Sequence, residues 1–203
     1  MRPMAGNGKY DWVIFDAMGV IYTYGDDVAE LMIPYLRKLG CELDDDEIFN
    51  EFTRCSRGEV SSETMWKNCG AGDIDAIDIE HTSFYTLNPG FLQTLKDLKE
   101  AGFRIACLSN GPGEWSRLLR RRFGLDHWIE KWIISGDVRR QKPDPEIYKI
   151  LLCAIEAEPK RCFFVDDTAR NLPPAEKFGM TTYLFKGRSP ATMFDDVVNA
   201  VTR

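Results

Sequence analysis

Several polar residues that directly follow short apolar runs could act together on an anionic substrate. A carboxylate can attack phosphorus or carbon, and further carboxylates are ligands that Mg²⁺ prefers. Hydroxyl and backbone N–H groups can hold phosphate oxygens, and a lysine can offset developing negative charge. These residue types predict phosphoryl transfer. The set is Asp16 after "WVIF" (12–15), Ser109, Asn110 and Gly111 after "FRIACL" (103–108), Lys142 after "WIIS" (132–135), and Asp166 and Asp167 after "CFFV" (162–165).

The apolar runs predict buried strands, because each is short and rich in β-branched or aromatic residues. A fifth run is "TTYLF" at 181–185. Helical patterns that begin near a Pro and end near a Gly or Pro occupy 88–102, 144–159 and 169–180. This alternation predicts an α/β fold with a mostly parallel sheet and helices on both faces. Because parallel strands end at the same edge, we expect the polar groups to lie together there.

Residues 23–87 break this alternation. They show helical patterning without a convincing strand, and they are too long for one crossover between neighbouring strands. Acidic residues outnumber basic ones by 15 to 5 in this stretch. The pattern predicts a helical cap at 23–87, inserted after the first strand of a core made of 9–22 and 88–203. Such an insertion can roof a site at the carboxyl edge of the sheet.

The composition narrows the class of protein. The chain has 203 residues, of which 44% are hydrophobic and 29% charged, as in ordinary globular proteins. No apolar run approaches the roughly 20 residues of a membrane span, and "MRPMAGNGKYDW" has no signal-peptide pattern, so we expect a cytoplasmic protein without a membrane partner. The net charge of −6 disfavours nucleic-acid binding. We expect a small-molecule substrate and a monomer or homodimer.

Four motifs in order resemble those of the haloacid dehalogenase-like (HAD) hydrolases: "VIFDAMGV", "IACLSNG", "QKPDPEIY" and "FFVDDTARNLPPAEKFGM". The resemblance spans residues 10–187. It implies a Rossmann-like core with a C1-type helical cap, and Mg²⁺ as cofactor. The implied roles are Asp16 as the nucleophile that forms an aspartyl-phosphate, Ser109, Asn110 and Gly111 as phosphate binders, Lys142 as charge stabiliser, Asp16, Asp166, Asp167 and the backbone carbonyl of Met18 as metal ligands, and Asn171 as a supporting residue.

Met18 departs from the family pattern. Phosphatases of the family generally read D-x-D, and their second Asp exchanges a proton with the leaving group and with water. A methionine side chain cannot do this, and general acid-base help is typically worth about 10²- to 10⁴-fold in rate. The backbone carbonyl of residue 18 is retained. The sequence therefore predicts an intact nucleophile and metal platform without its usual proton-transfer side chain.

Four functions stay open. We favour a Mg²⁺-dependent phosphatase for a small phosphorylated metabolite, with an acid that is dispensable or supplied by Glu59, Glu63 or His81. A 2-haloacid dehalogenase is the second, since these resemble "DAMGV" with "DAYGT"; they need no metal and lack a pair of acids like "DD" at 166–167. A phosphonatase-like enzyme would use Lys38 or Lys67 as a Schiff-base former. The last is a catalytically impaired HAD-fold protein with a binding or regulatory role.

Overall fold

A computed structural model of the chain describes residues 8–71 and 74–203. Its strands are β1 (Trp12–Phe15), β2 (Arg104–Ser109), β3 (Lys131–Ile134), β4 (Cys162–Asp166) and β5 (Thr181–Leu184). Its longer helices are α1 (Ile33–Lys38), α2 (Asp45–Ser56), α3 (Ser62–Asn68), α4 (Ile74–Ser83), α5 (Phe91–Glu100), α6 (Gly113–Arg122), α8 (Pro145–Ile155), α9 (Leu172–Phe178) and α10 (Pro190–Thr202). Short turns of helix are η1 (Val28–Met32), η2 (Leu125–His127), α7 (Ser135–Val138), η3 (Pro159–Arg161) and η4 (Ala169–Asn171).

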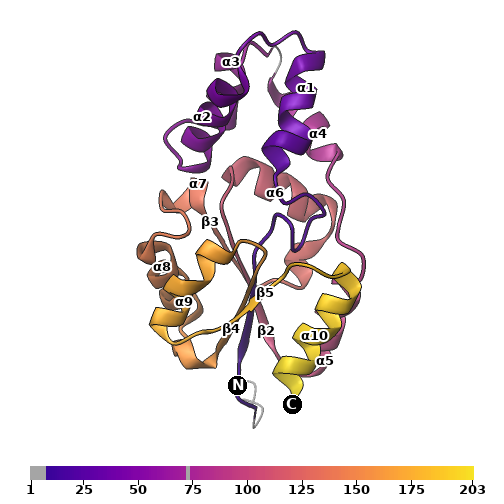
Figure 1. Ribbon diagram of the computed structural model, residues 1–203, viewed down its shortest axis with the longest axis vertical. Helices are drawn as coiled ribbons and strands as arrows, with labels where there is room; N and C mark the ends of the chain where they lie inside the picture. The colour runs from indigo at the N-terminus through magenta and orange to yellow at the C-terminus, as the bar shows by residue number, and fades with distance from the viewer. Residues whose placement is uncertain (1–7, 72–73) are drawn as a thin grey trace.

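The strands form one parallel sheet in the order β3-β2-β1-β4-β5 (Figure 1). Each lies within one residue of an apolar run in the sequence, which confirms the predicted α/β fold. In the register, Phe15 lies between Cys107 on β2 and Val165 on β4. The residues that follow these partners therefore emerge at one edge of the sheet, as the strand endings predict.

Alternation along the strands divides the core into two layers. Val13 and Phe15 face α5, α6 and α10, whereas Trp12 and Ile14 face α8 and α9. Both faces of the central strand are fully covered, because all four residues of β1 are buried. A strand buried on both faces needs a continuous apolar run, which is the pattern that "WVIF" shows. No helix in the described part of the chain has both the length and the apolarity needed to cross a membrane.

The helices from η1 to α4 lie beyond the carboxyl edge of the sheet, at the top of Figure 1. The chain leaves and re-enters the sheet-bearing part at paired points: Tyr22 forms an antiparallel bridge with Leu87, and Thr23 N–H donates to the Thr86 carbonyl over 3.0 Å. The Asn88 amide then donates to three carbonyls of residues 19–22. We call residues 23–87 the helical insertion; its standing as a separate cap domain stays a prediction.

The helical insertion has its own apolar core, which receives one residue from outside. Trp115 of α6 packs among these side chains, 4.3 Å from His81 and 5.6 Å from Trp66 between ring centroids. Buried Asp78 accepts the indole N–H of Trp66 (2.7 Å) and of Trp115 (2.6 Å), and the hydroxyl of Ser62 (2.6 Å). One carboxylate thus joins α3, α4 and α6.

We predict that Asp78→Ala will loosen the helical insertion. Three buried donors would lose their acceptor, and since each such loss costs about 1 to 3 kcal/mol, the free energy of unfolding should fall by about 3 kcal/mol or more. Hydrogen exchange should speed up in α3 and α4 more than in β1 and β2. Asp46→Ala, at an exposed position of α2, is the control and should change stability by less than about 0.5 kcal/mol. Equal exchange in both variants would contradict this role.

Candidate functional site

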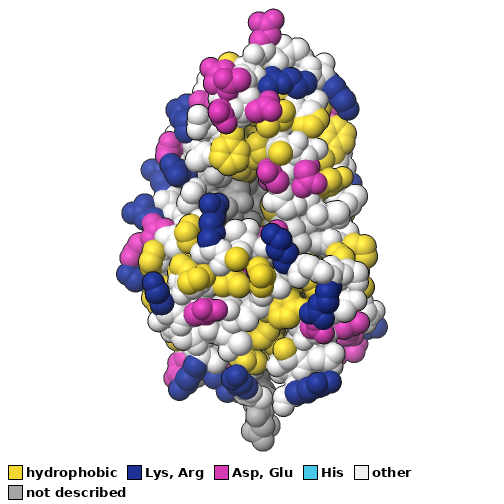
Figure 2. Space-filling model, viewed as in Figure 1, with side chains coloured by type: hydrophobic (Ala, Val, Ile, Leu, Met, Phe, Trp, Pro, Cys, Tyr) yellow, Lys and Arg dark blue, Asp and Glu magenta, His cyan; other side chains and the backbone are white. Residues whose placement is uncertain are grey.

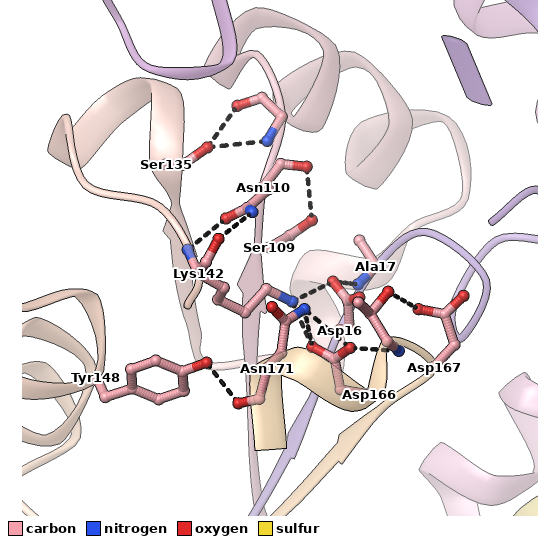
Figure 3. Close-up of polar contacts among 12 residues, drawn as sticks. Asp16, Ala17, Ser109, Asn110, Ser135, Lys142, Tyr148, Asp166, Asp167 and Asn171 are labelled. Carbon is pink, nitrogen blue, oxygen red and sulfur yellow. Dashed lines mark hydrogen bonds and ion pairs between the residues drawn. The ribbon is translucent and has the colours of Figure 1, made fainter. Parts of the chain in front are cut away.

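The site is organised around Lys142, whose ammonium group lies between two buried carboxylates (Figure 3). Its Nζ is 2.7 Å from Asp16 Oδ1 and 2.7 Å from Asp166 Oδ2. Lys142 is only 2% exposed as a whole residue, and Asp16 and Asp166 are 6% and 0% exposed. Asp16 follows β1, Asp166 ends β4, and Lys142 comes from the loop between α7 and α8. The sheet edge therefore brings together three residues that are up to 150 positions apart in the chain.

Local hydrogen bonds fix both acids. The N–H of Ala17 donates to Asp16 Oδ1 over 2.7 Å, and the N–H of Thr168 donates to Asp166 Oδ1 over 2.8 Å. Asn171 donates its amide to both oxygens of Asp166 at 3.1 Å, so the predicted supporting residue does contact the site. The backbone carbonyl of Asn171 accepts a hydrogen bond from the phenol of Tyr148 over 2.6 Å (Figure 3). These hydrogen bonds from the chain hold both acids in place.

The cluster holds three acids and one ammonium group, that of Lys142. Burial, followed by the charge of Asp166, raises the pKa of Asp16 to about 8 despite the neighbouring ammonium. Burial lowers the pKa of Lys142, but the charges of Asp16 and Asp166 outweigh it and raise that pKa above its ordinary value. Burial also raises the pKa of Asp167. One ammonium therefore faces more carboxylate charge than it can neutralise.

A divalent cation would suit this arrangement. Asp16, Asp166 and Asp167 each offer one carboxylate oxygen, and these oxygens lie within 4.8 Å of one another. Two glycines make room for Asp167: a Cβ on Gly19 would lie 2.1 Å from its Oδ2, and one on Gly25 would lie 3.0 Å away. Oxygen ligands of this kind fit Mg²⁺. The donor set thus fits the predicted cofactor.

The polar residues after β2 lie beside the cluster, but two of them have protein partners. The side chain of Asn110 pairs with the backbone of Lys142 through two hydrogen bonds, of 2.8 and 2.9 Å. The N–H of Gly111 donates to Ser135 Oγ over 3.0 Å. The hydroxyl of Ser109 makes a single long contact, 3.4 Å from the Asn110 carbonyl. Among the polar groups of Ser109, Asn110 and Gly111 described here, this hydroxyl therefore has the weakest protein contact. Phosphate binding by these residues stays a prediction.

Met18 does not stand among the charged groups. Its side chain is partly buried and packs against the apolar core that contains Tyr22 and Leu119. Asp16 and Met18 are thus close in sequence but lie in different surroundings, one polar and one apolar. Metal ligation by the Met18 carbonyl stays a prediction.

The candidate acids and lysines of the helical insertion occupy varied surroundings. His81 is buried among aromatic rings, and burial lowers its pKa to about 3, so at neutral pH its ring is uncharged and does not act as an imidazolium acid. Glu63 and Lys67 form an exposed ion pair with one another at 2.5 Å. Lys38 is exposed at the end of α1. Glu59 lies beside Arg57 and Arg139 in an open cleft of about 620 Å³.

Sequence reasoning missed Ser135, which is fully buried and joins three segments. Its Oγ accepts from Gly111 and donates to the carbonyl of Ser56 at the end of α2 over 2.5 Å, so it links the helical insertion to the β2 and β3 loops. The only signal in the sequence is a polar residue at the end of a predicted strand.

Figure 2 shows a hollow between the helical insertion and the sheet-bearing part of the molecule, with Lys or Arg side chains beside it.

Comparison with solved structures supports the fold. The HAD family enzyme of Bacteroides thetaiotaomicron, solved in complex with magnesium and inorganic phosphate, superposes with a TM-score of 0.74 and 22% identity, over 86% of this chain and 93% of that one. This likeness establishes the fold and leaves the substrate open.

Curated relatives include two kinds of hydrolase. An (S)-2-haloacid dehalogenase of Burkholderia cepacia is 34% identical over 94 residues, which are 46% of this chain and 41% of the relative. A flavin mononucleotide hydrolase of Arabidopsis thaliana is 25% identical over 185 residues, which are 88% of this chain and 73% of the relative. The match to the dehalogenase thus spans less than half of that protein's length. The family model for haloacid dehalogenase-like hydrolases matches residues 10–179, and this chain belongs to that family.

Proposed function

We propose that the protein is a Mg²⁺-dependent phosphatase for a small phosphorylated metabolite and acts through an aspartyl-phosphate on Asp16. The supporting observation is the charge imbalance of the cluster: three acids converge, and Lys142 is the ammonium that contacts two of them. Uncompensated buried charge is costly, so such a site gains from a divalent cation. Asp16, Asp166, Asp167 and the carbonyl of Met18 would hold the ion. When bound, Mg²⁺ would offset the negative charge of a phosphoryl group.

The side chains around the cluster have different roles in the proposed reaction. A carboxylate oxygen of Asp16 attacks phosphorus, the bond from phosphorus to the leaving oxygen breaks, and water later hydrolyses the acyl phosphate. Lys142 keeps Asp16 oriented through its 2.7 Å contact and offsets charge on the phosphoryl oxygens. The Ser109 hydroxyl donates to one of these oxygens. Asn110 positions Lys142 by accepting a hydrogen bond from its backbone N–H, and Asn171 positions Asp166 by donating its side-chain amide to the carboxylate.

Met18 sets the choice of substrate in this proposal. Without an acid at residue 18, expulsion of an alkoxide gets no proton from that position, so substrates with stable leaving groups should react best. Acyl and aryl phosphates have such leaving groups. The helical insertion beyond the sheet edge favours small substrates over polymers.

A 2-haloacid dehalogenase is the second candidate. The identity to the Burkholderia cepacia enzyme supports it, and so do the apolar surroundings of Met18. In this case Asp16 would attack carbon and expel halide. The acidic pair at 166–167 argues for the phosphatase.

The direct test is a phosphatase screen of the purified protein with and without Mg²⁺, using acetyl phosphate, an aryl phosphate and sugar phosphates. We expect Mg²⁺-dependent turnover that is fastest for acetyl and aryl phosphate and is lost in Asp16→Asn. Absence of turnover, together with absence of a beryllofluoride adduct on Asp16, would refute the phosphatase. Metal-independent halide release from a 2-haloacid would select the dehalogenase.

We also expect the binding of Mg²⁺ to release a proton from Asp16. With a pKa of about 8, Asp16 is mostly protonated at pH 7 when no metal is bound, and a metal ligand must be ionised. Mg²⁺ binding should therefore release up to about one proton at pH 7, and its apparent affinity should rise as the pH is raised toward 9. Titration calorimetry in two buffers of different ionisation enthalpy measures this release. Heats that do not depend on the buffer at pH 7 would contradict the prediction.

The role of Asp167 as a metal ligand can be tested through its neighbour Gly19. Gly19 has φ +73°, and Gly19→Ala would put a methyl group 2.1 Å from Asp167 Oδ2, so the carboxylate must move. Mg²⁺ affinity should fall by at least about tenfold, as is common when a metal site is disturbed. Gly40→Ala is a matched control with φ +84° and open space around the new methyl, so it should cost about 1 kcal/mol of stability and leave Mg²⁺ binding unchanged. Equal affinities in both variants would place the metal elsewhere.

A further inference from the structure

An open cleft of about 620 Å³ lies between the helical insertion and the loop that carries Lys142. Residues 57–59, which follow α2, form one wall, and residues of the 139–144 loop, which follows α7, form the other. The end of α2 lies directly above α7 at the left of Figure 1. The volume is within the range of small-molecule sites. Neither the acids of the Asp16 cluster nor Ser109 line this cleft, so it is separate from the candidate active site.

Three arginines line this cleft, which we call the arginine cleft: Arg57, Arg139 and Arg140. All three are exposed, and none forms an ion pair with an acid that the structure describes. Arg57 donates one N–H to Gln141 over 3.3 Å, and Arg140 donates one to the carbonyl of Arg139 over 2.8 Å. Since a guanidinium group has five N–H donors, most donors of this set are open to a ligand.

Two acids also line the arginine cleft, and both have other contacts. Asp144 accepts the N–H of Glu146 at the start of α8 over 2.9 Å, and Glu59 lies 3.9 Å from Arg54 of α2. Three arginines and two acids give the cleft a net charge of +1, whereas the whole chain carries −6. This local excess of positive charge favours an anion as ligand.

The backbone that carries these arginines is closely packed. A Cβ on Gly58 would lie 2.3 Å from the carbonyl oxygen of Gly136 and 3.1 Å from Cγ of Arg139, so the side chain of Arg139 lies against the helical insertion. Arg139 has φ +56°, in the left-handed region. That conformation strains a residue with a Cβ and does not strain a glycine. An arginine at such a position indicates a use for its side chain.

The chemistry of the arginine cleft selects a phosphate group. Guanidinium groups bind phosphate oxygens in pairs, through two parallel N–H donors. A dianion gains more than a single carboxylate from three arginines, and this gain exceeds the repulsion from Glu59 and Asp144 more readily. The net charge of −6 disfavours a polynucleotide as the source of the phosphate.

We propose that the arginine cleft is a second anion site, which binds a phosphate group of a small molecule. Gln141 and Pro143, the neighbours of Lys142, line it, so an anion there would draw the helical insertion toward the lysine loop. The phosphate group belongs either to a separate small molecule or to the far end of a substrate held at Asp16. Binding at this cleft needs no turnover and is therefore independent of the reaction at Asp16.

Calorimetric titration of the purified protein with inorganic phosphate and with pyrophosphate, in EDTA, tests the site. Without a divalent cation, the three acids around Asp16 repel an anion, so the arginine cleft should take it. Arg140→Gln and Arg139→Gly should each weaken binding by at least about tenfold, because each removes charged donors. Arg121→Gln is the control: Arg121 is exposed outside the cleft, and its loss should change the affinity by less than about twofold.

Arg139→Gly has a second readout in the absence of phosphate. Glycine adopts φ +56° without strain, so Tm should not fall while phosphate binding weakens. Glu156→Gly is the matched control, since Glu156 has φ +50° at the end of α8, outside the cleft, and this variant should bind phosphate as the native chain does. If Arg139→Gly loses stability, Arg140→Gln decides.

Kinetics separate the two sources of the phosphate group. For the far end of a substrate, Arg140→Gln should raise KM for a sugar bisphosphate by about tenfold and leave KM for the matching monophosphate unchanged. For a separate molecule, both KM values should stay unchanged while phosphate binding weakens. Absence of saturable phosphate binding to the native chain, native affinity in Arg140→Gln, or an equal loss in Arg121→Gln would overturn the site.

Discussion

The buried ammonium of Lys142 is the interaction on which the edge of the sheet depends. The buried carboxyl groups of Asp16 and Asp166 both lie 2.7 Å from it, and among the described residues it is the cation that contacts them. Removal of one partner from a buried ion pair typically costs about 3 to 5 kcal/mol. The chain therefore controls the lysine backbone closely: Asn110 donates to it and accepts from it. The loop after β2 thus positions Lys142, which lies in the loop between α7 and α8, and Asp16 directly follows the central strand β1.

The same edge also holds the helical insertion in place. Ser135, the first residue of α7, contacts the loop after β2 and the last turn of α2. On the other side, Trp115 of α6 reaches into the insertion and donates to Asp78. Arg122, at the end of α6, donates to the carbonyls of Thr82 and Tyr85. The insertion is therefore fixed at two places, so any opening of the site must break buried hydrogen bonds at one of them.

Local patterns in the sequence were enough to predict the sheet and the convergence of Asp16, Lys142 and Asp166, because short apolar runs that end in polar residues are signals confined to a few positions. The pairing of Asn110 with the Lys142 backbone was not predictable, since it depends on how two loops approach each other. His81 shows the same limit: a histidine in a helical segment reads as a possible acid, but its aromatic surroundings and lowered pKa appear only once α4 packs against α6.

Asp16 has polar surroundings and Met18 has apolar ones, and this difference explains the residue type at position 18. One position earlier the chain turns out of the sheet, with the Ala17 N–H bonded to Asp16, and by residue 18 the side chain faces the apolar layer under α6. A carboxylate in that layer would be buried beside Leu119 and would need a polar partner, whereas a thioether fills the space without that cost. The absence of an acid at residue 18 therefore goes together with apolar packing of that side chain, while Asp16, Asp166 and Asp167 lie together with Lys142.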